Sequence, residues 1–251
     1  MKRSDDDKLL LRIQQRFNKA CADYVLIEDG DRILVGVSGG KDSLALLELM
    51  GNRAKILKPH FEVEAVHVKM SNIPYDVDID YLNQQAERAG VRLHVCETQF
   101  DASTDHRHTP CFLCSWNRRK MMFEKAKELH CNKIALGHHM DDILVTLLMN
   151  MTFQGAFGTM PPKLKMDKFD MMVIRPLCRV CEADLERMAA IRGYKPQVRQ
   201  CPYEDASHRN EMKRILAEMM QMNPDARYNI WGAMTNIQTD LLPQPEVEVE
   251  V

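Results

Sequence analysis

Long hydrophobic segments are absent from this 251-residue chain, and its longest apolar runs are far too short to span a bilayer. The first residues, Met1–Lys8, carry too many charges for a signal peptide. A strong excess of one charge is also absent, because 36 acidic residues nearly balance 34 basic ones. We therefore expect a cytoplasmic protein with no membrane partner, in which any RNA-binding surface is a local patch.

Cysteine, in contrast, is plentiful, with eight residues in the chain. Disulfides are rare in the cytoplasm, so closely spaced cysteine pairs there indicate metal or redox chemistry. The 18 methionines stand mostly at core-like positions of predicted helices, and we interpret them as packing residues.

The most informative stretch is an apolar strand-like run, Ile33–Val37, that ends at a Ser-Gly-Gly turn and passes at once into a helix-like pattern. Such a turn exposes backbone N–H groups beside a helix N-terminus, which together bind an anion, most often phosphate. It is not a Walker A loop, because Val35 and Asp42 stand where that motif needs glycine and serine or threonine. The segment Ser38–Ser43 instead resembles the PP-loop of ATP pyrophosphatases, which cleave ATP between its α and β phosphates. The resemblance implies that ATP is bound by Ser38, Gly39, Gly40, Lys41, Asp42 and Ser43.

Strand-like and helix-like segments alternate along the chain, which predicts an α/β fold with a doubly wound parallel sheet and right-handed crossovers. We divide the chain into an N-terminal helical segment (1–28), a PP-loop ATP-binding and cluster domain (29–205), C-terminal helices (206–240) and a disordered tail (241–251). The predicted strands are 33–37, 61–68, 91–96, 132–136 and 171–177. The predicted helices are 5–22, 44–57, 77–89, 115–130, 143–151, 183–191, 207–222 and 224–238.

Several polar residues are expected at the carboxyl ends of these strands, where open α/β sheets bind ligands. His67 ends the second strand and either borders the adenine or is a hydrogen-bonded structural histidine. Gly137 follows the fourth strand, and Asp141 and Asp142 begin the next helix. A carboxylate there binds Mg²⁺, acts as a base or caps the helix. Asp42 is likewise either a Mg²⁺ ligand or a cap.

Two cysteine pairs share the CxxC spacing, Cys111 with Cys114 and Cys178 with Cys181, and Cys201 precedes a proline. One such pair suits a metal ion, an iron–sulfur cluster or a redox dithiol. Two pairs together suggest structural zinc. Spacing alone does not choose among these sets.

Five motifs occur in an order that closely resembles the tRNA 2-thiocytidine synthetase family, which thiolates a cytidine in the tRNA anticodon loop. The resemblance covers roughly residues 10 to 225 and is far more specific than any single motif. The motifs are Ser38–Ser43, Cys111/Cys114 followed by Arg118-Arg119, Leu136–Leu147, Met160–Leu164 and Val173–Leu177.

The resemblance implies a [4Fe-4S] cluster held by Cys111, Cys114 and Cys201, with one iron left open for sulfur. Family members carry a CxxC near the third ligand, whereas this chain has Cys201 followed directly by proline. Cys178 and Cys181 do not fall on the family's cluster positions.

The family's chemistry predicts transfer of AMP from ATP to the C2 oxygen of cytidine, followed by attack of sulfur on C2. The resemblance implies catalytic roles for Lys41, Arg118 and Asp142, a Mg²⁺ ion at Asp42, and ATP contacts from His67 and Gly137. For RNA we expect Arg118, Arg119, Lys120 and Lys163 to contribute, although a short charge run is more often a solvated face. Further expected partners are a sulfur donor such as a cysteine desulfurase and a second copy of the chain.

Three alternatives remain open at this point. The first alternative is an enzyme that thiolates another tRNA base. The second is an enzyme that adenylates a substrate and then transfers an amine to it. The third is a nucleotide-binding protein with a structural zinc site.

Overall fold

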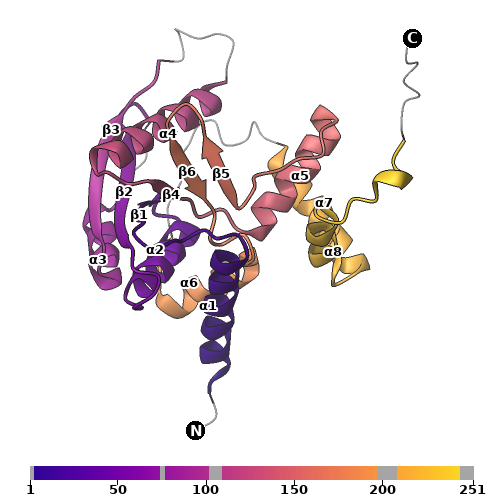
Figure 1. The fold of residues 1–251 in the computed structure, drawn as a ribbon, viewed down its shortest axis with the longest axis horizontal. Helices are drawn as coiled ribbons and strands as arrows, with labels where there is room; N and C mark the ends of the chain where they lie inside the picture. Colours follow the sequence, from indigo (N-terminus) through magenta and orange to yellow (C-terminus); the bar gives the residue numbers. More distant parts are fainter. Residues whose placement is uncertain (1–2, 74–76, 102–108, 197–207, 244–251) are drawn as a thin grey trace.

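A computed structural model describes residues 3–73, 77–101, 109–196 and 208–243, and these residues form one six-stranded sheet flanked by helices (Figure 1). The strand order is β3-β2-β1-β4-β6-β5, and every neighbouring pair except the last is parallel. The predicted doubly wound α/β fold is confirmed. The strands are β1 Arg32–Gly36, β2 Glu62–Met70, β3 Arg92–Thr98, β4 Lys133–Ala135, β5 Lys163–Met166 and β6 Met171–Ile174.

The edge strand β5 is a difference from the sequence prediction, which placed the last strand at 171–177 and none before it. β5 runs antiparallel to β6, with Lys163 opposite Ile174, so the sheet is mixed rather than wholly parallel. Its sequence, Lys-Leu-Lys-Met, is short and carries two lysines. Such a strand is typical of a sheet edge, where charged side chains discourage further pairing.

The helices cover both faces of the sheet (Figure 1). Alternate residues of β1 point to opposite layers: Ile33 and Val35 pack in the core that includes residues of α1, α2, α3 and α6, whereas Leu34 packs with Phe123 of α4. α5 packs instead against the C-terminal helices α7 and α8. The helices are α1 Asp5–Asp23, α2 Lys41–Ala54, α3 Ile79–Ala89, α4 Pro110–Glu128, α5 Met140–Gln154, α6 Glu182–Arg192, α7 Arg209–Met222 and α8 Ala226–Ala233.

Helix α4 begins five residues before its predicted start at 115. The side chain of Thr109 accepts a hydrogen bond from the N–H of Phe112 at 3.3 Å, and Pro110 occupies the first turn. Both features are typical of a helix N-terminus. Cys111 therefore lies in the first turn of the helix, and Cys114 lies at the start of the second.

Some predictions fall outside the described residues. These are Cys201, the boundary between 205 and 206, and residues 244–251 of the predicted tail. Among the described residues, no helix combines the length and apolar character that crossing a membrane requires.

Candidate active site

The PP-loop turn is fastened by the hydroxyl of Ser43. This oxygen accepts hydrogen bonds from the N–H groups of Ser38 at 3.1 Å and Gly39 at 3.2 Å, and it donates to the carbonyl of Gly40 at 2.9 Å. Gly39 has φ = 91°, a backbone conformation that favours glycine. The turn therefore delivers the first-turn N–H groups of α2, which lack intrahelical partners, to the end of β1.

Gly137 brings the loop between β4 and α5 against the start of α2. A Cβ atom at this position would lie 3.2 Å from the carbonyl carbon and oxygen of Asp42 and from the nitrogen of Ser43. Only glycine fits this approach without a shift of backbone. Close packing against the start of α2 thus explains glycine at position 137 independently of its predicted contact with ATP.

A cavity of about 690 Å³ opens at the carboxyl ends of β1, β2 and β4. This is the edge at which open α/β sheets bind ligands. The predicted residues that line it are Ser38, Gly40, Lys41, Asp42, Ser43, His67, Arg118, Gly137 and Asp142. Residues that sequence analysis missed are His138, His139, Glu182, Arg209, Asn210 and Lys213.

The two ring nitrogens of His67 differ in their hydrogen bonding. Its Nδ1 lies 2.8 Å from the carbonyl oxygen of Val37 and therefore carries the proton. Nε2 is buried and has no hydrogen-bond partner among the described residues. Burial lowers the pKa of this imidazole, so Nε2 is a hydrogen-bond acceptor in a side chain that lines the cavity.

The next helix, α5, begins with a reciprocal cap between His139 and Asp142. The N–H of Asp142 donates to His139 Nδ1 at 3.3 Å, and the N–H of His139 donates to Asp142 Oδ2 at 3.2 Å. The neighbouring His138 lines the cavity, and burial, with the nearby Arg175 guanidinium, lowers its pKa to about 4. His138 is therefore neutral at neutral pH.

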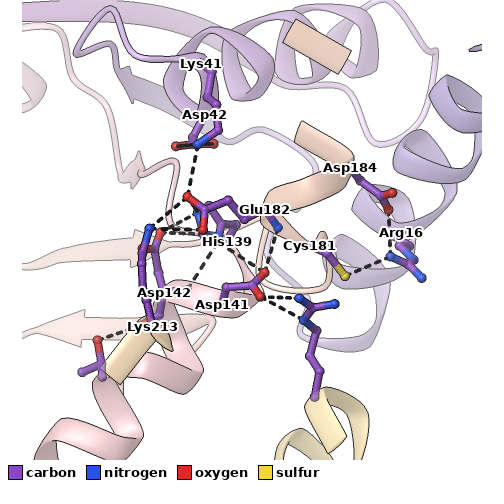
Figure 2. Close-up of polar contacts among 12 residues, drawn as sticks. Arg16, Lys41, Asp42, His139, Asp141, Asp142, Cys181, Glu182, Asp184 and Lys213 are labelled. Carbon is purple, nitrogen blue, oxygen red and sulfur yellow. Dashed lines mark hydrogen bonds and ion pairs between the residues drawn. The ribbon is translucent and has the colours of Figure 1, made fainter. Parts of the chain in front are cut away.

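The two adjacent aspartates have different surroundings (Figure 2). Asp142 lines the cavity and accepts a hydrogen bond from Arg209 of α7. His139 and Arg209 outweigh burial and lower the pKa of its carboxyl. Asp141 is buried and turns to α6 and α8, where it binds the N–H of Glu182 at 2.7 Å and the guanidinium of Arg227 at 2.7 Å. Asp142, and not Asp141, is the carboxylate available to a ligand.

Lys41 and Lys213 meet at the carboxylate of Glu182 (Figure 2). Glu182 Oε1 lies 3.4 Å from Lys41 Nζ and 2.9 Å from Lys213 Nζ. Lys41 also lies 3.3 Å from Asp42. Burial alone would raise the pKa of Glu182, but Lys213, His139 and Lys41 lower it, so this carboxylate is ionised.

One face of α4 connects the predicted cluster cysteines with the cavity. Cys111, Cys114, Arg118 and Met122 follow one another at spacings of three or four residues and so share a helix face. Arg118 and Met122 line the cavity. Cys111 is exposed and Cys114 is half-buried. The two thiols thus continue, toward the helix N-terminus, the surface that borders the cavity.

The second CxxC pair lies in the core. Cys178 is fully buried beside Ala20 and Ile143, and burial raises the pKa of its thiol to about 12. Cys181 is buried at the start of α6, where its sulfur accepts a hydrogen bond from Arg16 at 3.3 Å. Across the described ranges, no three histidine, cysteine or carboxylate side chains are grouped as metal ligands. The suggested four-cysteine zinc site is therefore not formed by these pairs.

The predicted RNA-binding residues fall into two groups. Arg119 and Lys120 are exposed in the middle of α4, where Lys120 sits 5.7 Å from the ring centre of Trp116. Lys163 lies on β5, where its ammonium donates to the carbonyl of Val25 at 2.8 Å and pairs with Glu28 at 3.3 Å. Intramolecular partners thus hold Lys163, whereas Arg118 lines the cavity.

A phosphate-binding turn of this kind at the carboxyl edge of a parallel sheet defines a PP-loop nucleotide-binding protein, and the PP-loop domain model matches residues 9–219. The tRNA-cytidine(32) 2-sulfurtransferase of Burkholderia multivorans is 38% identical over 242 residues, which cover 93% of this chain and 71% of the relative. That of Syntrophotalea carbinolica is 35% identical over 237 residues, 93% of this chain and 92% of the relative. The chain belongs to this family of PP-loop enzymes.

Solved structures support the same fold. The U34-tRNA thiolase NcsA from Methanococcus maripaludis with its [4Fe-4S] cluster matches with a TM-score of 0.74 at 24% identity, over 92% of this chain and 79% of that one. The NH3-dependent NAD synthetase from Campylobacter jejuni matches with a TM-score of 0.50 at 12% identity, over 94% of this chain and 90% of that one. At these identities the likeness concerns the fold alone.

Proposed function

We propose that the protein is an ATP-dependent tRNA thiolase that forms 2-thiocytidine in the anticodon loop. Family membership supports the reaction class, because the relatives are named tRNA-cytidine(32) 2-sulfurtransferases. The observation that carries the mechanism is the shared face of α4. It places Cys111 and Cys114 on the side of the helix from which Arg118 and Met122 line the cavity. Base activation and sulfur delivery would then occur next to each other.

ATP would lie with its phosphates at the PP-loop and its adenine toward His67. The first-turn N–H groups of α2 and the ammonium of Lys41 are suited to the pyrophosphate group. His67 Nε2, a buried acceptor, is suited to the adenine amino group. Asp42 at the cavity wall is a carboxylate of the kind that Mg²⁺ prefers, so this residue would hold a Mg²⁺ ion that offsets the negative charge of the phosphates.

The first chemical step joins the cytidine C2 oxygen to the α-phosphorus of ATP. The bond between the α-phosphorus and the bridging oxygen breaks, and pyrophosphate leaves with its charge balanced by Lys41 and Mg²⁺. Arg118 is suited to bind the AMP phosphate once it is on the base. The oxygen of C2, a poor leaving group, thereby becomes part of AMP.

The second step forms the carbon–sulfur bond and expels AMP together with the former C2 oxygen. When held by Cys111, Cys114 and Cys201, a [4Fe-4S] cluster would supply an iron with an open position for the attacking sulfur. The two described thiols fit this group in chemistry and in placement, and Cys201 lies outside the described residues. Asp142, ionised at the cavity wall, would receive the proton that the attacking hydrosulfide gives up as the carbon–sulfur bond forms and AMP leaves.

Two further parts of the proposal concern partners. A sulfur donor such as a cysteine desulfurase would replace the sulfur consumed in each turnover. A second copy of the chain is the remaining expected partner, and gel filtration with light scattering measures it directly.

Anaerobic purification followed by iron, sulfide and zinc analysis tests the proposed cofactor. About four irons and four sulfides per chain, with the absorption of an iron–sulfur cluster, are expected. Zinc without sulfide would overturn the cluster and favour a nucleotide-binding protein with structural metal. Thiouridine in the product tRNA would instead redirect the proposal to another base.

A further inference from the structure

Helix α7 contributes two cations to a cavity that is otherwise built by the sheet and its loops. Arg209 and Lys213 stand four residues apart, on one face of α7, and both line the cavity. Arg214, the neighbour of Lys213, does not line it: its side chain is 75% exposed and pairs with Glu218 one turn further on. The helix therefore has one cationic face toward the cavity and an ordinary solvated face beside it.

These cations contact carboxylates at the PP-loop end of the cavity. Lys213 pairs with Glu182 (Figure 2), and Arg209 pairs with Asp142. A single oxygen of Glu182 lies 2.9 Å from Lys213 Nζ and 3.4 Å from Lys41 Nζ. A carboxylate oxygen and a phosphate oxygen are both strong acceptors of charge-assisted hydrogen bonds. One phosphate oxygen in the place of Glu182 Oε1 would thus contact the PP-loop lysine and the α7 lysine together.

The arrangement around Asp142 is similar. Arg209 donates to Asp142 Oδ1, and both residues line the cavity beside the start of α5. Lys41, Arg209 and Lys213 are matched in charge by the carboxylates that they contact, Asp42, Asp142 and Glu182, while Arg118 adds a fourth cation to the cavity wall. An incoming triphosphate disturbs that balance, and the cations must then exchange carboxylate for phosphate partners.

We propose that Arg209 and Lys213 bind the triphosphate of ATP, and that Glu182 holds the position of a phosphate oxygen until the nucleotide enters. The inference rests on the ATP binding in the proposed function and extends the phosphate site from the PP-loop to the C-terminal helices. Because α7 packs on α5 and α8, nucleotide binding would also fix these helices against the sheet.

Equilibrium binding of ATP, AMP and adenosine to the full-length protein tests the assignment. For Arg209→Ala and Lys213→Ala we expect ATP to bind about tenfold more weakly, since each loses a charge-assisted hydrogen bond, while adenosine binds as before. Lys213→Arg should recover part of the loss. Arg214→Ala is the matched control on the same helix and should bind all three ligands like the wild type.

The direction in which Glu182→Gln changes ATP affinity shows whether Glu182 competes with phosphate or has a structural role. If Glu182 competes with phosphate for Lys41 and Lys213, the variant should bind ATP several-fold more tightly. If Glu182 instead positions Lys41 for ATP, binding should weaken, and the inference is overturned. It is equally overturned if Arg209→Ala and Lys213→Ala leave ATP affinity unchanged or weaken ATP and adenosine alike.

Failure of the proposed function is distinguishable from failure of this inference. A wild-type protein that does not bind ATP overturns both. A wild-type protein that binds ATP but does not thiolate tRNA overturns only the thiolase proposal, because the α7 contacts are measured by nucleotide affinity. Thermal melting of each variant without ligand controls for loss of folding.

Discussion

The carboxylate of Asp141 accepts a hydrogen bond from the backbone N–H of Glu182 at 2.7 Å, which ties the first turn of α5 to the first turn of α6. The other carboxylate oxygen of Asp141 binds Arg227 of α8. Glu182 in turn contacts the PP-loop lysine, Lys41. Asp141 therefore positions, from outside the cavity, a residue that lines it.

Replacing Asp141 should mainly lower the stability of the fold, because Asp141 lies outside the cavity. In Asp141→Ala the half-buried Arg227 loses its partner and the N–H of Glu182 loses its acceptor, so we expect the free energy of unfolding to fall by about 2 kcal/mol. Urea unfolding measures this loss. Asp142→Asn is the paired variant, for which we expect a large drop in thiolation with a smaller change in stability. Equal stability effects of Asp141→Ala and Asp142→Asn would contradict the distinction.

The cysteine assignment predicts a contrast between two pairs of identical spacing. Cys111→Ala and Cys114→Ala should each abolish the iron–sulfur absorption and thiolation, because both thiols lie on the α4 face that borders the cavity. Cys201→Ala should have the same effect. Cys178→Ala, in the core, should retain iron and sulfide with only a loss of packing stability. A brown Cys111→Ala protein, or a colourless Cys178→Ala protein, would redraw the site.

Stability should depend on pH through His138. Its folded-state pKa is about 4, against about 6.5 for a solvent-exposed imidazole, so in this interval the unfolded chain binds a proton that the folded protein does not. The contribution of neutral His138 to the free energy of unfolding is complete above pH 6.5. It falls by on the order of 2 kcal/mol as the pH decreases from 6.5 toward 4. His138→Gln should flatten this part of the stability curve. The carboxylates Asp142 and Glu182, with lowered pKa values, lose their contribution at the acid end of this interval and below it. Identical curves for wild type and His138→Gln between pH 4 and 6.5 would refute the prediction.

The exposed basic residues in the middle of α4 should control tRNA affinity more than Lys163 does. Each phosphate contact contributes about one unit to the slope of log affinity against log salt, so Arg119→Ala and Lys120→Ala should each reduce that slope by about one. Lys163 is held by Val25 and Glu28, and Lys163→Ala should leave the slope unchanged. Filter binding over a salt series measures all three. A larger effect at Lys163 than at Arg119 would move the RNA surface to β5.

The sequence was informative wherever a local pattern determines the structure. The Ser-Gly-Gly turn between an apolar strand and a helix identified the PP-loop, because glycine conformations and helix N-terminal N–H groups are local properties. The sequence does not predict the edge strand β5, because its four residues, two of them lysines, are too few to show a reliable hydrophobic alternation. The early start of α4 was missed for a related reason: Thr109 and Pro110 signal the cap, but the cysteines that follow show no apolar period.

The missing site residues have a different cause. Arg209 and Lys213 are far from the PP-loop in sequence, and on α7 alone they are indistinguishable from a solvated face such as that of Arg214. Only the packing of α7 on α5 brings them to the cavity. Likewise, the two CxxC pairs have identical spacing, and burial, which depends on the whole fold, separates Cys178 from Cys111.

The most direct test of the account is nucleoside mass spectrometry of tRNA after anaerobic incubation with the cluster-loaded protein, sulfide and Mg·ATP. The account predicts 2-thiocytidine that appears only with ATP, is accompanied by AMP and pyrophosphate, and is lost in Lys41→Ala although that variant retains its iron and sulfide. Thiocytidine formed without ATP, or ATP hydrolysed to ADP and phosphate with no thiolated base, would contradict it.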